Sequence, residues 1–226
     1  LRPKHWFKNL FLFLGLALAL WLYKLNLDSN TLVLAILSFF LASIISSANY
    51  IINQITDKEF DKKHPVKRHR PIPSNKVPVL AAYYLFFVLT AIVLIVSKVI
   101  FTFEFTLSLL SLWLAGFLYN VKPVRLKDIA YIDVVSESIN NPIRFLIGWF
   151  LVTTAFPAVS LLLFTWSAGA IVMTAKRYIE LLKYAGDLTI YRKTFKVYTR
   201  KSLMTMIYLY SILSLLFGIF AYKNYA

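Results

Sequence analysis

Residues 32–61 read LVLAILSFFLASIISSANYIINQITDKEFD, an apolar run that ends in a cluster of acidic residues. A helix that crosses a bilayer needs about 20 mostly apolar residues, and the part from 32 to 56 is long enough. The rest of the chain has the same character, since 59% of its 226 residues are hydrophobic and only 15% are charged. Soluble domains contain roughly 25% charged residues. The composition therefore indicates an integral membrane protein and excludes a soluble globular enzyme, a disordered chain and a nucleic-acid-binding module.

Hydropathy predicts an all-α fold, a polytopic transmembrane helix bundle. We expect seven spans, at about residues 10–23, 32–56, 77–97, 102–119, 131–151, 157–178 and 203–222. The first span is short and follows basic residues, as the apolar region of a signal peptide does. No small-residue cleavage site follows it, and Trp21 and Tyr23 resemble an interfacial aromatic belt, so we expect this span to be retained. The chain has no cysteine, which excludes disulfides and thiolate chemistry.

The basic residues predict the orientation of the bundle. Nearly all of the 25 Lys and Arg residues lie before the first span or in the segments 58–76, 120–128 and 176–201. The opposite side carries only Lys24, Lys98 and Lys223. Because short loops rich in Lys and Arg remain in the cytoplasm, we expect the N-terminus and these three loops to be cytoplasmic.

A first group of polar residues ends the second span. Asn53, Asp57 and Asp61 are spaced by four residues, so they share one face of a helix. Carboxylates on one face repel each other unless a cation lies between them, and Mg²⁺ prefers one or two protein carboxylates together with water and phosphate oxygens. The spacing therefore predicts a Mg²⁺ site. The alternative is a frayed helix end that carries ordinary surface acids.

A second group of polar residues opens the fifth span. Asp133, Glu137, Asn140 and Arg144 again share one helical face, and Asp128 precedes them in the loop. Charged groups inside a span are costly and usually face a cavity. We therefore expect two walls, one from each helix, that meet around a metal. The alternative is that Arg144 pairs with Glu137 or Glu180 and holds the helices together.

A compact basic cluster follows the first acidic group. It contains Lys67, Arg68 and Arg70, and the next cytoplasmic loop adds Lys122 and Lys127. The guanidinium fork of arginine binds phosphate oxygens through two hydrogen bonds at once. Arginines beside carboxylates therefore indicate a diphosphate or another phosphorylated substrate. Positive-inside topology and the binding of anionic lipid headgroups are the alternatives.

These motifs resemble a known family. The segment from Asn53 to Asp61, with the basic cluster 67–70 and Pro71 after it, resembles the first aspartate-rich motif of the UbiA superfamily of intramembrane prenyltransferases, and residues 119–133 resemble its other motif. Residues 1–9, 176–180 and 200–203 resemble the branch that contains the decaprenyl-phosphate phosphoribosyltransferases. The resemblance covers essentially the whole chain. The family fold has nine spans, so we expect residues 1–226 to form a single UbiA-like domain without the last two helices of the family.

The resemblance implies a cofactor, Mg²⁺, and a set of site residues. Gln54 occupies a position where the family usually has aspartate, so one expected ligand is neutral. Asp57, Asp61 and Asp133 are the expected catalytic residues. The expected metal ligands are Asn53, Asp57, Asp61, Asp128, Asp133 and Glu137, and the expected phosphate-binding residues are Lys67, Arg68, Arg70, Lys122, Lys127, Lys176 and Arg177.

The resemblance also implies a reaction. We expect a Mg²⁺-dependent transferase that acts on a polyprenyl phosphate or diphosphate, with phosphoribosyl transfer from phosphoribosyl diphosphate to polyprenyl phosphate as the first candidate. Prenyl transfer from a prenyl diphosphate to an aromatic or lipid acceptor is the alternative, because the segment 119–127 is longer than expected for the phosphoribosyl branch. An ion-coupled transporter is the non-enzyme alternative, but it needs polar groups that continue toward the outer face, and the first, third and fourth spans contain almost none.

Overall fold

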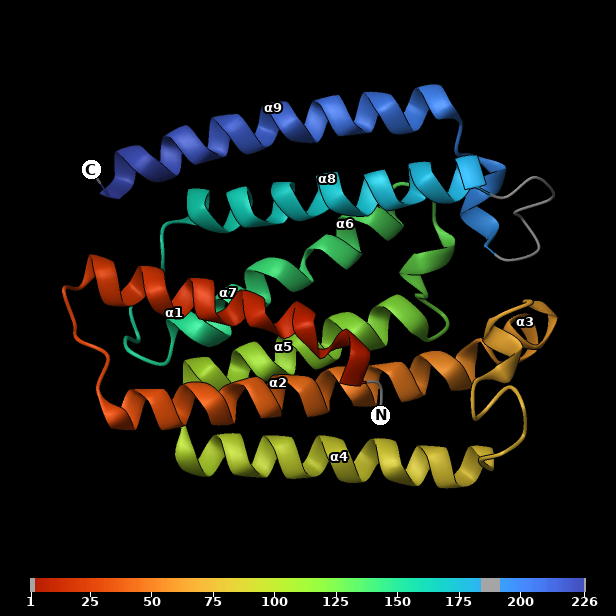
Figure 1. Ribbon diagram of the computed structural model, residues 1–226, viewed down its shortest axis with the longest axis horizontal. Helices are drawn as coiled ribbons and strands as arrows, with labels where there is room; N and C mark the ends of the chain where they lie inside the picture. Colours follow the sequence, from red (N-terminus) through yellow and green to blue (C-terminus); the bar gives the residue numbers. More distant parts are fainter. Residues whose placement is uncertain (1–2, 184–191, 226) are drawn as a thin grey trace.

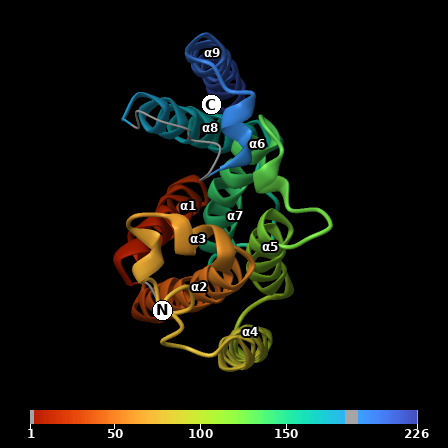
Figure 2. The same cartoon turned by 90° about the vertical axis from the view of Figure 1, so that its right-hand side faces the viewer.

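The computed structural model describes residues 3–183 and 192–225, and every regular element in this part of the chain is helical. The long helices run side by side along one axis (Figure 1). An end-on view places α4 and α9 on opposite sides of the bundle (Figure 2). The predicted all-α membrane bundle is thereby confirmed. Its helices are α1 (Phe11–Leu22), α2 (Ser29–Thr56), α3 (Lys58–Lys63), α4 (Val79–Ile100), α5 (Phe103–Asn120), α6 (Ile132–Ser138), α7 (Asn140–Trp149), α8 (Val159–Lys183) and α9 (Arg200–Tyr225).

Four of the described helices, α2, α4, α8 and α9, are long and apolar enough to cross a membrane. Six predicted spans agree with α1, α2, α4, α5, α8 and α9 to within a few residues. The fifth predicted span, over 131–151, is divided in the structure into α6 and α7, with Ile139 between them. Pro142 has no N–H to donate, and its ring crowds the carbonyl four residues earlier, which belongs to Ser138 at the end of α6.

Local hydrogen bonds define both ends of α2. Asp28 precedes α2 and accepts a hydrogen bond of 2.8 Å from the backbone N–H of Thr31, which is an N-cap interaction. At its other end α2 passes almost directly into α3, since the backbone N–H of Asp61 still donates to the carbonyl of Asp57 at 2.8 Å. This hydrogen bond continues the helical pattern from α2 into α3. The acidic residues at the end of α2 and in α3 therefore remain on the same face.

Two glycines bring α1 and α7 into backbone contact. A Cβ atom on Gly148 would lie 1.7 Å from the carbonyl oxygen of Leu12, and one on Gly15 would lie 2.0 Å from that of Phe145. Small residues permit this close approach between helices in a membrane. Elsewhere α8 pairs with α9, and α2 packs against both α4 and α5.

The outer faces of α4 and α9 are apolar. Large hydrophobic side chains are exposed along both helices, among them Leu80, Phe87 and Ile95 on α4 and Leu209, Ile212 and Leu215 on α9. Inside the bundle, Phe105, Leu109 and Phe145 are fully buried. Apolar residues on the outside as well as the inside suit a protein whose solvent is lipid. The polar segments that follow α2 and α5, and residues 192–199 before α9, gather at one end of the bundle (Figure 1).

Candidate functional site

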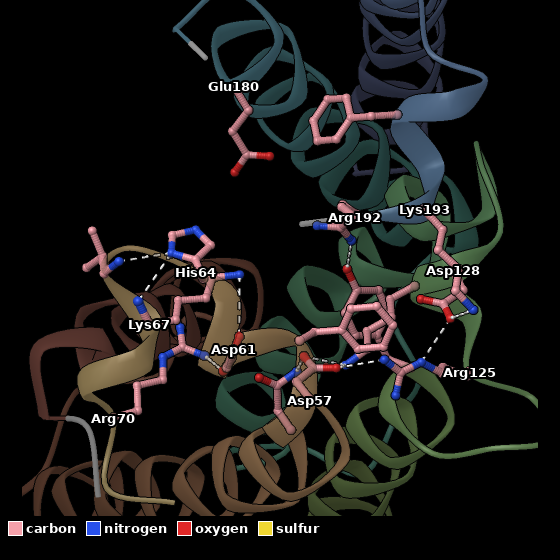
Figure 3. A pocket seen from close by; sticks show the side chains of 16 residues that line it. Asp57, Asp61, His64, Lys67, Arg70, Arg125, Asp128, Glu180, Arg192 and Lys193 are labelled. Atoms are coloured by element: carbon pink, nitrogen blue, oxygen red, sulfur yellow. Dashed lines mark hydrogen bonds and ion pairs between the residues drawn. The ribbon is translucent and has the colours of Figure 1, made fainter. Parts of the chain in front are cut away.

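A polar cavity of about 410 Å³ lies at that end of the bundle (Figure 3). Segments far apart in the sequence form its walls: the end of α2 with α3 and the loop after it, the end of α5 with its following loop, the end of α8, and the segment before α9. Six basic side chains face four acidic ones, so the formal charge of the lining is positive. The basic residues are Lys67, Arg70, Arg125, Lys127, Arg192 and Lys193, and the acidic residues are Asp57, Asp61, Asp128 and Glu180.

Asn53, Asp57 and Asp61 all line this cavity, so the structure brings these three predicted residues together. Asp57 is paired with two cations from the loop after α5: Arg125 at 2.7 Å and Lys127 at 2.8 Å. The side-chain amide of Asn53 donates to Asp57 at 3.3 Å. The first wall is therefore tied directly to the loop after α5.

Asp61 is almost fully buried and is held by the basic cluster that follows it. Arg70 lies 2.7 Å from its carboxylate and Lys67 lies 3.9 Å from it. Burial raises the pKa of Asp61, and the charges of Arg70 and Lys67 oppose that shift. The ion pair with Asp61, which lines the cavity, holds the guanidinium of Arg70 at the cavity wall.

The loop after α5 adds a buried lysine. Lys127 lies in the 3₁₀ segment Leu126–Asp128, between the carboxylate of Asp57 and the side-chain oxygen of Asn120, which is 2.9 Å away. Burial lowers the pKa of Lys127 to about 8, although the charge of Asp57 opposes the shift. This ammonium group lines the cavity but is largely buried, and its hydrogen bond to the carboxylate is of the strong, charge-assisted kind.

Arg125 occupies a strained position in the same loop. Its φ of 37° lies in the left-handed region, which costs a residue other than glycine about 1–3 kcal/mol. The guanidinium of Arg125 offsets this cost by forming ion pairs with Asp57 at 2.7 Å and with Asp128 at 3.0 Å. Asp128 also binds Lys193 at 3.2 Å. Burial disfavours the charged form of Asp128, but the bonds from Lys193 and Arg125 outweigh it and lower the pKa.

The second predicted wall lies behind the cavity. Asp133 is completely buried and pairs with Arg177 at 3.0 Å, with Arg192 at 3.1 Å and with the hydroxyl of Tyr198. Glu137 receives hydrogen bonds of 3.0 Å from both Arg177 and the hydroxyl of Tyr119. Neither carboxylate is part of the cavity lining, whereas Tyr119 and Arg192 are. The polar face of α6 is thus covered by the side chains that line the cavity.

Several predicted phosphate-binding residues lie elsewhere. Arg68 is exposed and its Nε donates to His69 at 3.2 Å, and Lys176 is also exposed. Arg177 is fully buried, and it pairs with Glu180 at 3.2 Å as well as with Asp133 and Glu137. Lys122 lines a neighbouring pocket of about 450 Å³ beside α3, which shares Phe60, Arg125 and Lys193 with the cavity.

The structure also answers the question that the sequence left open about Arg144. Its Nε donates to the side chain of Asn9 at 2.8 Å, and its Nη1 donates to the carbonyl of Asn140 at 3.3 Å. The arginine that pairs with Glu137 and Glu180 is Arg177. The alternative expectation, that Arg144 pairs with Glu137 or Glu180, is therefore not met among the described residues, and the cation that holds these two acids comes from α8.

The cavity lining includes residues that were not among the predicted site residues, such as Tyr119, Arg125, Arg192 and Lys193. Arg125, Arg192 and Lys193 lie in segments already identified as rich in positive charge, where the orientation of the protein in the membrane accounts for some of the basic residues. The sequence does not distinguish these cavity residues from the exposed basic residues beside them, because the difference lies only in their three-dimensional positions.

The first wall has the donor chemistry that a magnesium site needs. Two carboxylates and one amide oxygen, from Asp57, Asp61 and Asn53, face the same cavity. Within residues 3–183 and 192–225, no three His, Cys, Asp or Glu side chains gather into a metal-binding group. A site with two carboxylates fits Mg²⁺, which keeps several waters and takes further oxygens from a phosphate.

Comparison with known proteins agrees with this description. Residues 9–226 match the model of the UbiA prenyltransferase family. The chain is 28% identical over 209 residues to the decaprenyl-phosphate phosphoribosyltransferase of Corynebacterium glutamicum, which covers 88% of this chain and 58% of the relative. It is 30% identical over 204 residues to the enzyme of that name from Mycobacterium tuberculosis, with 88% and 64% covered. The chain thus spans about three fifths of the length of these curated relatives.

Solved structures share the fold. A UbiA homolog from Archaeoglobus fulgidus bound to DMAPP and Mg²⁺ superposes with a TM-score of 0.81 at 17% identity, covering 99% of this chain and 76% of that one. The same homolog bound to GPP and Mg²⁺ gives a TM-score of 0.80. A bundle of apolar helices with a polar, net-positive cavity at one end defines an integral membrane protein. The chain belongs to the UbiA prenyltransferase family.

Proposed function

We propose that this protein is a Mg²⁺-dependent transferase that attaches a phosphoribosyl group from phosphoribosyl diphosphate to a polyprenyl phosphate. The observation that carries the proposal is the cavity itself. It combines the carboxylates of Asp57 and Asp61 with an excess of positive charge, six basic against four acidic side chains. Such a lining suits a substrate that is itself a polyanion and binds together with a divalent cation. The resemblance to the named phosphoribosyltransferases supports this choice of substrates.

In the proposed reaction the bond between ribose C1 and the diphosphate oxygen breaks, and its electron pair leaves with the diphosphate. An oxygen of the lipid phosphate forms the new bond to C1. Asn53, Asp57 and Asp61 would hold the metal, and Mg²⁺, when bound, neutralises charge on the leaving diphosphate. Arg70 and Lys127 line the same cavity as fixed positive groups, and they would stabilise the same developing charge without reorganising.

The position of the cavity suits one soluble and one lipid substrate. The cavity lies at the end of the bundle where the basic loops gather, and we expect that end to face the cytoplasm. The apolar outer faces of the helices leave the long polyprenyl tail in the bilayer while the phosphate reaches the polar end. A cavity partly closed from water also protects a cation-like ribosyl centre from hydrolysis.

Mass spectrometry of lipid products tests the proposal. The purified protein in lipid nanodiscs would receive Mg²⁺ with decaprenyl phosphate and phosphoribosyl diphosphate, or with a prenyl diphosphate and candidate aromatic or lipid acceptors. The proposal predicts a lipid product heavier by one phosphoribosyl group in the first reaction only. A prenylated product in the second reaction would favour prenyl transfer instead, and ion flux into liposomes without any product would favour a transporter.

A further inference from the structure

Arg192 lies on the wall of the cavity opposite the acidic face of α3. It belongs to the segment before α9, and Figure 3 shows it across the cavity from Asp61, Lys67 and Arg70. The two walls therefore come from distant parts of the chain. Charged groups that face each other across a cavity are suited to hold a ligand between them.

A buried network fixes the direction of the Arg192 side chain. Its Nη2 lies 3.1 Å from the carboxylate of Asp133 and donates to the hydroxyl of Tyr119. Asp133 is 0% exposed and is held in turn by Arg177 at 3.0 Å. The guanidinium is therefore oriented before any ligand arrives, which lowers the entropy lost on binding.

The same guanidinium keeps one donor unused. The Nε of Arg192 is buried and has no hydrogen-bond partner among the residues that the structure describes. A buried donor without an acceptor destabilises the structure that holds it. In addition, Arg192 is near enough to Lys67 for their positive charges to repel each other. An anion placed between them would pair with the guanidinium and remove that repulsion.

We infer that Arg192 is a phosphate-binding residue on the second wall of the cavity, and that Asp133 is a positioning residue that acts through it. This inference rests on the proposed function only in that a phosphorylated substrate enters the cavity. It gives the buried acid of α6 a role different from the metal ligand expected from the sequence. Both oxygens of Asp133 are already bound by protein donors, and the side chain is not part of the cavity lining.

Binding of inorganic diphosphate tests Arg192 directly. Isothermal titration of the full chain in detergent with Mg²⁺ would compare wild type, Arg192→Gln and Arg192→Lys. A hydrogen bond to a charged group contributes about 1.5–3 kcal/mol, so we expect Arg192→Gln to weaken binding roughly 10- to 100-fold, since each 1.4 kcal/mol is tenfold. Arg192→Lys should recover part of the loss. Lys196→Gln is the matched control, because it removes an exposed charge from the same segment without touching the cavity.

A double-mutant cycle tests Asp133. If it acts through Arg192, Asp133→Asn weakens diphosphate binding in the wild-type background and has no further effect when Arg192 is already Gln. A merely structural role would lower affinity equally in both backgrounds. Should Asp133→Asn fail to fold, Tyr119→Phe removes the other contact of Nη2 and enters the same cycle.

The outcomes separate the inference from the proposed function. If the Arg192→Gln variant binds diphosphate as tightly as the Lys196→Gln variant does, the inference is overturned, even if phosphoribosyl transfer is observed. Absence of diphosphate binding by the wild type would overturn it as well. A large loss of affinity in Arg192→Gln, in a protein that makes no phosphoribosyl lipid, would support the inference and contradict the proposed function.

Discussion

The guanidinium of Arg177 lies 3.0 Å from the carboxylate of Asp133, and neither side chain is exposed. The same guanidinium is 3.0 Å from Glu137 and 3.2 Å from Glu180. One cation on α8 therefore compensates two acids of α6 and one of its own helix. This arrangement makes Arg177 the electrostatic link between α6 and α8.

Arg177→Gln should therefore destabilise the protein strongly. Removing one partner of a buried ion pair leaves an uncompensated charge and costs about 3–5 kcal/mol. We expect a clear fall in Tm, measured by thermal unfolding in detergent. Lys176→Gln is the neighbouring control, because Lys176 is exposed, and surface substitutions usually change stability by less than about 0.5 kcal/mol. An Arg177→Gln protein as stable as Lys176→Gln would show that the acids are compensated in another way.

Asp57→Asn should abolish product formation while the bundle remains folded. The substitution keeps the shape of the side chain but removes the negative charge that a Mg²⁺ ligand provides and that pairs with Arg125 and Lys127. We expect product formation to fall more than about 100-fold, as a loss of several kcal/mol of transition-state stabilisation implies. Removal of metal with EDTA should have the same effect on the wild type.

Glu59→Gln is the matched control for this prediction, because Glu59 is two residues away and pairs only with the exposed Lys62 at 2.9 Å among the described residues. It should retain activity. Full activity of Asp57→Asn in saturating EDTA would contradict the metal site.

Arg70→Lys should raise KM for the phosphorylated substrate more than Arg68→Lys does. Both substitutions keep the positive charge and remove the fork that binds two phosphate oxygens at once. Arg70 lines the cavity and binds Asp61 at 2.7 Å, whereas Arg68 is exposed. We expect about a tenfold rise in KM for Arg70→Lys, the effect of one charged hydrogen bond. Equal KM values in steady-state assays of the two variants would mean that this cluster acts only through its charge.

The sequence predicts those parts of this protein that depend on neighbours along the chain. Span positions follow from about 20 consecutive apolar residues, and the grouping of Asn53, Asp57 and Asp61 follows from the helical repeat. Both are properties of a short segment. The hydrogen bond from Asp61 N–H to the carbonyl of Asp57 carries that repeat through the end of α2. The first wall of the site was therefore predictable without any knowledge of the other helices.

The second wall was not predictable in this way, because its contacts join distant segments. Arg177 and Asp133 are 44 residues apart in the sequence, and Tyr198 is 65 residues from Asp133. The sequence pattern showed correctly that the acids of α6 share a face, but it did not show that protein cations already cover this face. Arg68 and Arg70 illustrate the same limit, since only the turn between them decides which one reaches Asp61.

The contact between α1 and α7 gives a final prediction, about packing. The sequence contains only six glycines, and no spacing marks Gly148 as special. A Cβ atom there would lie 1.7 Å from the carbonyl oxygen of Leu12, whereas one on Gly218 would lie 3.3 Å from the ring of Phe164. Alanine usually stabilises a helix by about 1 kcal/mol relative to glycine. We expect Gly218→Ala to be close to neutral, because the ring can shift slightly.

Gly148→Ala should instead force the two backbones apart, since a backbone carbonyl has no other rotamer to adopt. Overpacking of this kind costs about 1–3 kcal/mol where side chains can adjust, so we expect a loss of about 3 kcal/mol or more here. Thermal unfolding of the two variants in the same detergent measures the difference. Equal Tm values for Gly148→Ala and Gly218→Ala would show that α1 and α7 do not touch through their backbones.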